Sequence, residues 1–484
     1  MLDRALQAQL EAILPPAALL LTPEETKPYE CDGLTLFRAQ PAAVVLPESE
    51  AQVVSILKAC HAARVPVVAR GAGTSLSGGA LPDPSGVVLS LAKFKRILAI
   101  DAVARTAVVQ PGVRNLAISE AAAPYGLYYA PDPSSQIACS IGGNVAENAG
   151  GVHCLKYGLT VHNVRRVRGV LITGDVVEFG GESLDSPGYD LLALINGSEG
   201  LLAVITEITV KLLPKPQLAQ VALAAFDDVE KAGAAVGAII AAGIIPAGLE
   251  MMDKPATRAV EQFVHANYPL DAAAVLLVES DGTNEEVAAE MADIRRILME
   301  AGATEVRVSR DEAQRLLFWS GRKAAFPAVG RISPDYYCID GTIPRKALPR
   351  VLRSIAEWSK EFGLECANVF HAGDGNLHPL ILYDANREGE IARTVAFGDR
   401  ILELCIAVGG TVTGEHGVGV EKLNTMCIQF GAAELTRFHG IKEAFDLHRL
   451  LNPGKAVPTL HRCAEMGRMH VHGGQVPHSD LPRF

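Results

Sequence analysis

The stretch VPVVARGAGTSLSGGALP (residues 65–82) decides the fold class, because it joins a short apolar run to a glycine-rich loop. Val65–Ala69 predicts a buried strand. The glycines that follow match neither common nucleotide motif: Gly71 and Gly73 are followed by glycine only at 78, and Gly79 replaces the lysine of a P-loop. A glycine-rich turn still exposes backbone N–H groups that can cradle a diphosphate. A tight structural turn is the alternative, and composition leaves both open.

Around this loop the chain alternates between helices and strands. Ser49 predicts a helix start, Ser140 is placed to cap a short helix facing an anion, and Pro214 and Pro216 mark a domain boundary. A capping box at Ser309–Glu312 predicts a helix that stops before Pro327. The other expected elements are helices at 1–16, 50–63, 113–125, after Asp227-Asp228 and at 387–408, and a hairpin at 167–181.

A second motif, NVFHAGDGNLHPLILY (residues 368–383), carries two histidines around a Gly-Asp-Gly turn. A two-residue turn at Asp374-Gly375 would place His371 opposite His378, with Cβ atoms roughly 4.5–5.5 Å apart. The glycine-rich stretch 413–419 adds Glu415 beside His416. Together, His371, His378 and Glu415 suit a divalent metal such as Zn, Mn or Fe with open positions. Ordinary packing explains most isolated histidine pairs, but the opposed pair with Glu415 favours a metal.

Composition limits the function classes. At 484 residues the chain is expected to form two or three domains, and its net charge of −11 argues against non-specific binding of nucleic acid or of an anionic membrane. Nine scattered cysteines without Cys-x-x-Cys indicate a reducing compartment, buried thiols without a disulfide framework, and no conventional iron–sulfur cluster. The uncharged run Ala232–Leu249 contains Pro246 and several glycines, so it predicts a helix and a strand rather than a membrane span.

Five ordered stretches point to a family: ARGAGTSLSGGA, PDPSSQIACSIGGNVAENAGG, GSEGLLAVIT, HAGDGNLHP and GEHGVG. Together they resemble the FAD-linked oxidase family of the vanillyl-alcohol oxidase (PCMH) type, over nearly the whole chain. Members of this family include D-lactate, D-2-hydroxyglutarate and glycolate dehydrogenases. The stretch RKAAFPAVGRISPDYYCIDGTIPR and the tail LNPGKAVPTLHRCAEMGRMHVHGG are most similar to the flavoprotein subunits of bacterial glycolate oxidases.

The resemblance implies an α+β fold in four parts. These are an N-terminal helical segment (1–37), a two-part PCMH-type FAD-binding domain (38–217), a β-sheet and helix substrate and metal domain (218–457), and a C-terminal tail (458–484) for partner docking. The end of the substrate domain is expected to pack back on the FAD domain. Backbone amides of Arg70, Gly71, Ala72, Gly73, Thr74, Ser75, Leu76, Ser77, Gly78 and Gly79 would hold the FAD pyrophosphate. Pro131, Asp132, Ser134, Ser140, Gly143, Asn144, Gly150 and Gly151 would line the flavin, and Glu199, Gly200 and Ile205 would close the site.

The same resemblance implies the chemistry. A small 2-hydroxy acid, glycolate or D-lactate, would be oxidised to the 2-oxo acid by hydride transfer to flavin, with Arg322 binding the substrate carboxylate and His416 taking the hydroxyl proton. The FAD is expected to be non-covalent, because the glycine loop has no histidine. Phe326 and Cys338 stand where hydroxyglutarate enzymes carry threonine and lysine, which favours a short monocarboxylate.

Other readings remain at this point. D-lactate or D-2-hydroxyglutarate dehydrogenase of the same family is one alternative, and a non-redox metal-dependent hydrolase or a non-catalytic assembly subunit are others. The likeness implies a second flavin-type subunit and an iron–sulfur subunit as partners. A cytoplasmic location follows from the lack of a signal segment, with contact to the inner membrane only through partners. The histidines of the tail (461, 470, 472 and 478) are candidates for docking.

Overall fold

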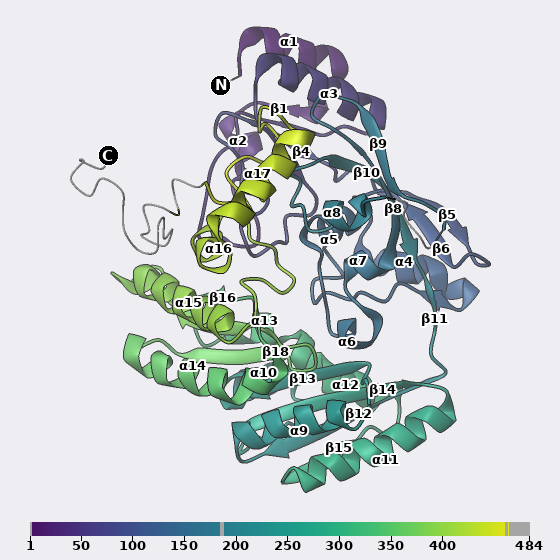
Figure 1. Ribbon diagram of the computed structural model, residues 1–484, viewed down its shortest axis with the longest axis vertical. Coiled ribbons are helices and arrows are strands. Elements are labelled where there is room, and N and C mark those ends of the chain that lie inside the picture. Colours follow the sequence, from purple (N-terminus) through teal and green to yellow (C-terminus); the bar gives the residue numbers. More distant parts are fainter. Residues whose placement is uncertain (1, 184–187, 460–462, 464–484) are drawn as a thin grey trace.

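The computed structural model describes residues 2–183, 188–459 and 463. Its elements separate into two halves (Figure 1). Residues up to about 217, together with the end of the chain, form the upper half. The remaining residues form the lower half, a large sheet with its helices. This is the α+β arrangement predicted from the sequence.

A small sheet carries the glycine-rich loop. In the described residues it has the strand order β1-β2-β4-β3, and β2, β4 and β3 run parallel. Helix α3 begins as predicted, since the Ser49 side chain accepts a hydrogen bond from the N–H of Gln52. Apolar residues of α1 and α3 fill one core with the sheet. The bounds are β1 Leu19–Leu20, β2 Ala43–Val45, β3 Val67–Arg70, β4 Val87–Ser90, α1 Arg4–Ile13 and α3 Glu50–Ala63.

An antiparallel sheet completes the first half. Its order in the described chain is β5-β6-β10-β8-β9, and the predicted hairpin forms its β8–β9 edge. Ser140 caps the short helix α5 as expected, accepting from the N–H of Gly143. The bounds are β5 Ile97–Asp101, β6 Thr106–Val109, β8 Val164–Val170, β9 Val176–Gly180, β10 Val204–Lys211, α4 Asn115–Ala122, α5 Ile141–Glu147, α6 Cys154–Tyr157, α7 Thr160–Asn163 and α8 Leu191–Ile195. Strands β7 Leu127–Tyr128 and β11 Leu213–Pro214 pair beside it.

The second half is built on a sheet with the order β15-β12-β14-β13-β18-β19-β17 among the described residues. Helices α9, α11, α14 and α15 cover one face and α10, α12 and α13 the other, each over its own core. The strands are β12 Leu218–Phe226, β13 Gly248–Asp253, β14 Ala274–Gly282, β15 Glu305–Val308, β16 Asp335–Cys338, β17 Gly341–Thr342, β18 Cys366–His371, β19 Asn376–Leu377 and β20 Pro379–Tyr383. The helices are α9 Val229–Ala241, α10 Lys254–Val264, α11 Asn284–Glu300, α12 Glu312–Lys323, α13 Ala325–Val329, α14 Leu348–Phe362 and α15 Glu390–Ala407.

The end of the chain returns to the first half, as predicted. Helices α16 (Leu423–Gln429) and α17 (Ala432–Phe445), yellow in Figure 1, lie against the FAD-binding half. The ammonium of Lys442 donates to the carbonyl of Leu201, and Leu451 bridges to Val67 beside β3. The amide of Asn452 donates to the carbonyl oxygens of Gly79 and Glu199. This returning segment therefore holds the glycine-rich loop in place.

The register predicted for the histidine hairpin is wrong by two residues. His371 pairs with Asn376 rather than with His378, so the turn spans four residues instead of two. Asp374 explains the longer turn, because its carboxylate accepts from the N–H of Asn376, and Gly375 supplies a φ of +87°. A shift of two residues preserves the face of each side chain. The two imidazoles therefore still meet, with ring centroids 5.2 Å apart.

The start of α12 differs from expectation, whereas its end, before Pro327, agrees. The N-cap of α12 is Asp311, which accepts from the N–H of Gln314, whereas the hydroxyl of Ser309 accepts from the N–H of Val221 on a neighbouring strand. Helix α12 ends at Lys323, but a second short helix, α13, follows and contains Pro327. Proline is accommodated there because it lies in the first turn, where its missing N–H has no helical partner.

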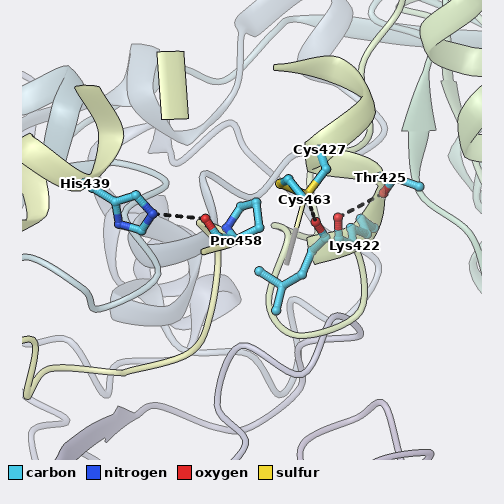
Figure 2. Close-up of a disulfide and its surroundings, with 7 residues drawn as sticks. Lys422, Thr425, Cys427, His439, Pro458 and Cys463 are labelled. Carbon is cyan, nitrogen blue, oxygen red and sulfur yellow. Dashed lines mark hydrogen bonds between the residues drawn. A yellow bond between two sulfur atoms is a disulfide. The ribbon is translucent and has the colours of Figure 1, made fainter. Parts of the chain in front are cut away.

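A disulfide contradicts the expectation of free thiols throughout. Cys427 on α16 is bonded to Cys463, with Cα atoms 5.3 Å apart (Figure 2). The two cysteines are 36 residues apart, so no motif based on cysteine spacing predicts the pair. The imidazole of His439 contacts the carbonyl of Pro458 in the same returning segment.

None of the helices in the described part of the chain combines the length and apolarity that a membrane span requires. The predicted docking histidines of the tail lie outside the described residues.

Candidate active site

A cavity of about 520 Å³ lies where the two halves meet. The glycine-rich loop and α5 form one wall, and side chains of the substrate half form the other. Predicted FAD-binding residues that line it are Arg70, Gly71, Ala72, Gly73, Thr74, Ser75, Leu76, Gly79, Ser134, Ser140, Gly143, Asn144, Glu199, Gly200 and Ile205. Predicted substrate and metal residues that line it are Arg322, His378, Glu415 and His416.

The glycine wall fits a ligand that approaches the backbone closely. A Cβ at Gly71 would lie 2.2 Å from the hydroxyl oxygen of Ser140, and Gly73 has a φ of +72°. The hydroxyl of Ser140 accepts from the N–H of Ala72 and of Gly143, which joins the loop to the first turn of α5. A wall of backbone amides without side chains is the surface that a diphosphate requires. The residues present therefore fit FAD.

Six predicted FAD residues stand behind this wall rather than on it. The carbonyl of Ser77 accepts from the N–H groups of Val420 and Glu421, and Gly78 abuts Val420. Asp132 holds the imidazole of His153 at 2.8 Å instead of facing the cavity. Those outside the lining are Ser77, Gly78, Pro131, Asp132, Gly150 and Gly151. Their role in binding the cofactor stays a prediction, and their observed contacts are structural.

The predicted metal residues come together. The Nε2 atoms of His371 and His378 lie 3.3 and 2.9 Å from one carboxylate oxygen of Glu415, and the ligand atoms of the three fit within 4.8 Å of one another. Glu415 Oε2 has no hydrogen-bond partner in the described chain, although it is buried. Two imidazole nitrogens around one carboxylate oxygen, with the second oxygen of the same carboxylate unpaired, are a donor set that a cation can satisfy. The set therefore fits a divalent metal.

Cys338 lies beside this set and was not predicted as a possible ligand. Its sulfur is 4.0 Å from Nδ1 of His378, while Nε2 of the same ring faces Glu415. Cys338, His378 and His416 form an overlapping group with metal-ligand geometry. Burial raises the pKa of the Cys338 thiol well above its usual value. Cys338 is thus a further candidate ligand beside the predicted set of His371, His378 and Glu415.

Glu250 joins the metal set to the predicted substrate arginine. It pairs directly with His371 across β13 and β18, and its two oxygens contact His371 Nδ1 and Arg322 Nε at 2.7 Å each. Arg322 is only 1% exposed, and its Nη2 has no partner among the described residues. A buried guanidinium nitrogen left unpaired is suited to a bound anion. Sequence reasoning missed Glu250; its signal was a single carboxylate inside an apolar strand.

Asp340 shapes the loop that carries Glu415 and His416, and it was also missed. Its carboxylate accepts from the backbone N–H groups of Gly414, Glu415 and His416 and from the ammonium of Lys422. Burial opposes ionisation, but Lys422 and the nearby imidazoles hold the pKa of Asp340 well below its usual range. An ionised Asp340 therefore holds the backbone of the loop 414–416 in place.

Glu199 fixes the same loop from the FAD-binding half. Its two carboxylate oxygens accept from the N–H groups of Val418 and Gly419, each at 2.7 Å. A Cβ at Gly417 would lie 2.0 Å from a carboxylate oxygen of Glu147 and 3.1 Å from Glu199, so only glycine fits. The predicted role of Glu199 in closing the FAD site stays a prediction, and its observed contacts hold the loop. The loop is thus held by both halves of the protein.

The charges of the site are strongly coupled. Burial disfavours a charged His371, but Glu250 and Glu415 outweigh it and raise the pKa of this imidazole well above 6.5. Burial also opposes ionisation of Glu415, yet His371 and His378 hold its pKa well below 4.5. Burial lowers the pKa of His416 to about 4, and the neighbouring His378 adds to this effect. These pKa shifts favour a positively charged His371 that faces an ionised Glu415, beside a neutral His416.

Comparison with known proteins defines the class and then the family. Residues 41–180 match the model of an FAD binding domain, so the glycine wall belongs to a flavin-dependent oxidoreductase. Residues 215–456 match the model described as FAD linked oxidases, C-terminal domain. The chain belongs to the FAD-linked oxidase family. Membership of a redox family favours the flavoenzyme over the hydrolase alternative.

Individual relatives agree with this assignment. The chain is 63% identical to the glycolate oxidase subunit GlcD of Escherichia coli K12, over 97% of this chain and 94% of the relative. It is 33% identical to a D-lactate dehydrogenase of Anaerostipes hadrus, over 91% and 94%. Among solved structures, p-cresol methylhydroxylase with bound substrate has a TM-score of 0.80 at 16% identity, covering 95% of this chain and 98% of that one. An alkyldihydroxyacetonephosphate synthase gives 0.75 at 17% identity, covering 94% and 86%. These two structural likenesses concern the fold alone.

Proposed function

We propose that the chain oxidises a short 2-hydroxy acid, glycolate or D-lactate, to the 2-oxo acid. The observation that carries the proposal is the buried pair of unpaired groups, Arg322 Nη2 and Glu415 Oε2, held by Glu250 and two imidazoles. One suits an anion and the other a cation. The names of the relatives, a glycolate oxidase subunit and a D-lactate dehydrogenase, support the same class of substrate.

Each side chain has one task in this proposal. The Arg322 guanidinium binds the substrate carboxylate, because its Nε is already engaged by Glu250 and its Nη2 remains available. His416 takes the hydroxyl proton on Nε2, which lies 3.8 Å from Glu415 Oε1 at the edge of the ligand set. Asp340 keeps the backbone of His416 in place through its N–H. These contacts support the proposed roles, and the lowered pKa of His416 favours the neutral imidazole that a proton acceptor needs.

The bound groups supply the remaining chemistry. The glycine wall would hold FAD, and the chemistry it would supply is a hydride acceptor for the substrate carbon. His371, His378 and Glu415 would hold a divalent metal, Zn, Mn or Fe, and the chemistry it would supply is stabilisation of negative charge on the substrate oxygen. We propose that FAD is bound without a covalent link, since the residues from Arg70 to Gly79 include no histidine. Flavin that stays with the protein after acid precipitation would contradict this.

The proposed assembly follows from the relatives. Because the Escherichia coli protein is named as a subunit, we propose that this chain also works with partners, a second flavin-type subunit and an iron–sulfur subunit. The absence of Cys-x-x-Cys in the sequence supports electron transfer to another chain. We propose a cytoplasmic location in which contact with the inner membrane occurs through those partners. Co-purification of the tagged chain from its native host tests this assembly.

An anaerobic titration of the purified flavoprotein tests the function. Glycolate or D-lactate should bleach the flavin absorbance, whereas L-lactate and D-2-hydroxyglutarate should do so far more slowly. Replacing His416 by Ala should slow the bleaching by roughly 10²–10⁴-fold, the usual size of a general-base contribution. The exposed His448 provides the matched control, and His448→Ala should keep the wild-type rate. Bleaching by none of the four acids would refute the proposed function.

A further inference from the structure

Three apolar side chains from both halves meet at the cavity. Leu76 comes from the glycine-rich loop, Phe326 from α13 and Tyr336 from β16, and all three line the cavity. All three also pack, partly buried, against the same apolar core of the substrate half. The rings of Phe326 and Tyr336 are 5.8 Å apart in an edge-to-face arrangement. We call Leu76, Phe326 and Tyr336 the collar.

The collar lies next to the groups that would bind the substrate. Arg322 lies near the end of α12 and Phe326 lies on α13, which begins after Ala324, and both residues line the cavity. Tyr336 precedes Cys338 by two residues on one strand, so both side chains are on the same face, and the Cys338 sulfur is 4.0 Å from His378. The collar therefore borders the anion site on one side and the metal set on the other.

Charge in this part of the cavity is unevenly distributed. Among the described residues, the cationic side chains that line the cavity are Arg70, Arg322 and Lys323. Arg70 donates to the carbonyl of Cys31, and Arg322 is engaged by Glu250, whereas Lys323 is exposed at the surface. A second carboxylate on the substrate would thus meet apolar collar atoms or a solvated Lys323. Burying an unpaired carboxylate against apolar groups is strongly unfavourable.

We infer that the collar selects the substrate by its chain beyond the hydroxyl-bearing carbon, accepting a hydrogen or a short uncharged group and rejecting long chains and second carboxylates. This inference rests on the proposed function, since it concerns the acid bound by Arg322. The two rings limit length, and the absence of any Arg or Lys other than Arg70, Arg322 and Lys323 among the described lining residues limits charge. An apolar pocket discriminates by about 10–200-fold for each methylene, so three side chains are enough to separate glycolate from longer acids.

A chain-length series tests the collar. The rates of flavin reduction are measured for glycolate, D-lactate, D-2-hydroxybutyrate, D-2-hydroxyhexanoate and D-2-hydroxyglutarate in the wild type and in Leu76→Ala, Phe326→Ala and Tyr336→Ala. Each truncation should raise the ratio of kcat/KM for hydroxyhexanoate to that for glycolate by about 10-fold or more. Tyr336→Phe keeps the ring and should leave this ratio near wild type. Phe263→Ala, an exposed phenylalanine on α10, is the surface control.

A second readout does not need turnover. Acetate, butanoate, hexanoate and glutarate are unreactive, and their dissociation constants can be measured by calorimetry on the same variants. The wild type should prefer acetate and butanoate, and the truncations should strengthen hexanoate binding selectively. Unchanged chain-length preferences in all three truncations, by rate and by binding, would overturn the collar. If Lys323→Met binds glutarate more weakly than the wild type does, then Lys323 controls the selection by charge. That result would overturn the claim that the collar rejects a second carboxylate.

The two readouts separate this inference from the proposed function. If no 2-hydroxy acid reduces the flavin, the proposed function fails, and the carboxylate binding series still decides whether the collar selects by length. If glycolate reduces the flavin but truncation changes neither series, the collar fails alone. Flavin absorbance per protein identifies any variant that does not fold, and the two remaining truncations then carry the test.

Discussion

The two walls of the cavity are built in different ways. The wall from the FAD-binding half is mostly backbone and small side chains, with Gly71 and Gly73 leaving room where a Cβ would collide. The wall from the substrate half combines apolar rings with polar and charged side chains, several of which are positioned by the buried carboxylates Glu250 and Asp340. A backbone wall tolerates change wherever the space is kept, whereas a side-chain wall depends on the identity of each residue. Substitutions should therefore affect cofactor binding and chemistry separately.

The strongest way to separate the two walls is Glu415→Gln. The change removes the carboxylate shared by His371 and His378 and keeps its shape. Flavin reduction should fall by about 10³-fold, because metal stabilisation of an alkoxide is worth several kcal/mol. Metal content by mass spectrometry should fall in parallel, while flavin absorbance per protein should stay at the wild-type level. Glu388→Gln, at an exposed site, is the control. Loss of flavin together with metal would contradict independent walls.

Glu250→Gln should have a smaller effect on the same wall. An amide keeps a hydrogen bond to Arg322 or to His371 but loses the negative charge between them. Metal affinity should fall by about 10–100-fold, the usual result of changing a group that supports a ligand. KM for the 2-hydroxy acid should rise in addition, since Arg322 loses its orienting partner. Competition with a chelator measures the affinity, and an unchanged affinity with unchanged KM would remove Glu250 from this role.

Gly71→Ala is the corresponding change on the backbone wall. Its Cβ would meet the Ser140 hydroxyl oxygen at 2.2 Å, so flavin affinity should fall by about 10-fold through overpacking. Ser140→Ala removes that oxygen, and the double variant should bind flavin nearly as well as Ser140→Ala alone. Fluorescence titration of the stripped protein with FAD gives the affinities. Additive losses in the double variant would show that the glycine is needed for another reason.

The smallest expected effect concerns His153, at the seam between the two walls. Its ring contacts Asp132 of one half and Glu279 of the other, and Arg315 and Trp319 also face Glu279. Burial opposes protonation, but the two carboxylates outweigh it and raise the pKa of His153 to about 10. The stabilisation is thus complete below the unfolded pKa near 6.5 and is lost as pH rises through about 10.

His153→Gln should therefore lower the free energy of unfolding by about 1 kcal/mol at pH 6, and the difference from the wild type should shrink toward pH 10. Urea unfolding of both proteins at pH 6, 8 and 10 measures this difference. Lys156→Gln provides a comparison, since Lys156 bridges the same two halves through Asp281. If the difference in the free energy of unfolding between the wild type and His153→Gln increased toward pH 10, His153 would not be protonated in the folded protein.

Much of the fold and the site was predictable because local signals carried it. Ser49 and Ser140 cap the helices expected from their side chains. Two motif stretches carry His371, His378, Glu415 and His416; His371 lies beside His378 and Glu415, and the other three line the cavity together with Arg322. Residues whose role depends on tertiary pairing were missed. Glu250 becomes important only because β13 and β18 pair it with His371, and Asp340 because the chain returns over it. Neither contact can be predicted from the position of the residue in the sequence.

The errors have the same origin. Ser309 satisfied a helix-capping pattern, but its hydroxyl is used by Val221 of another strand, so Asp311 caps the helix. The Cys427–Cys463 bond forms because the returning segment passes α16, a contact that separation along the chain cannot reveal. In each case a partner distant in sequence decided between two locally acceptable arrangements. Single-sequence reasoning is weakest for such competitions.

The four-residue turn between His371 and Asn376 constrains how this segment can drift during evolution. One inserted residue would exchange the sides presented by every position from Leu377 to Tyr383, sending the imidazole of His378 away from Glu415. A second insertion would restore it. Descendants that keep both imidazoles on Glu415 should therefore show turn lengths that differ by even numbers of residues, so selection here would preserve the parity of the turn rather than its length.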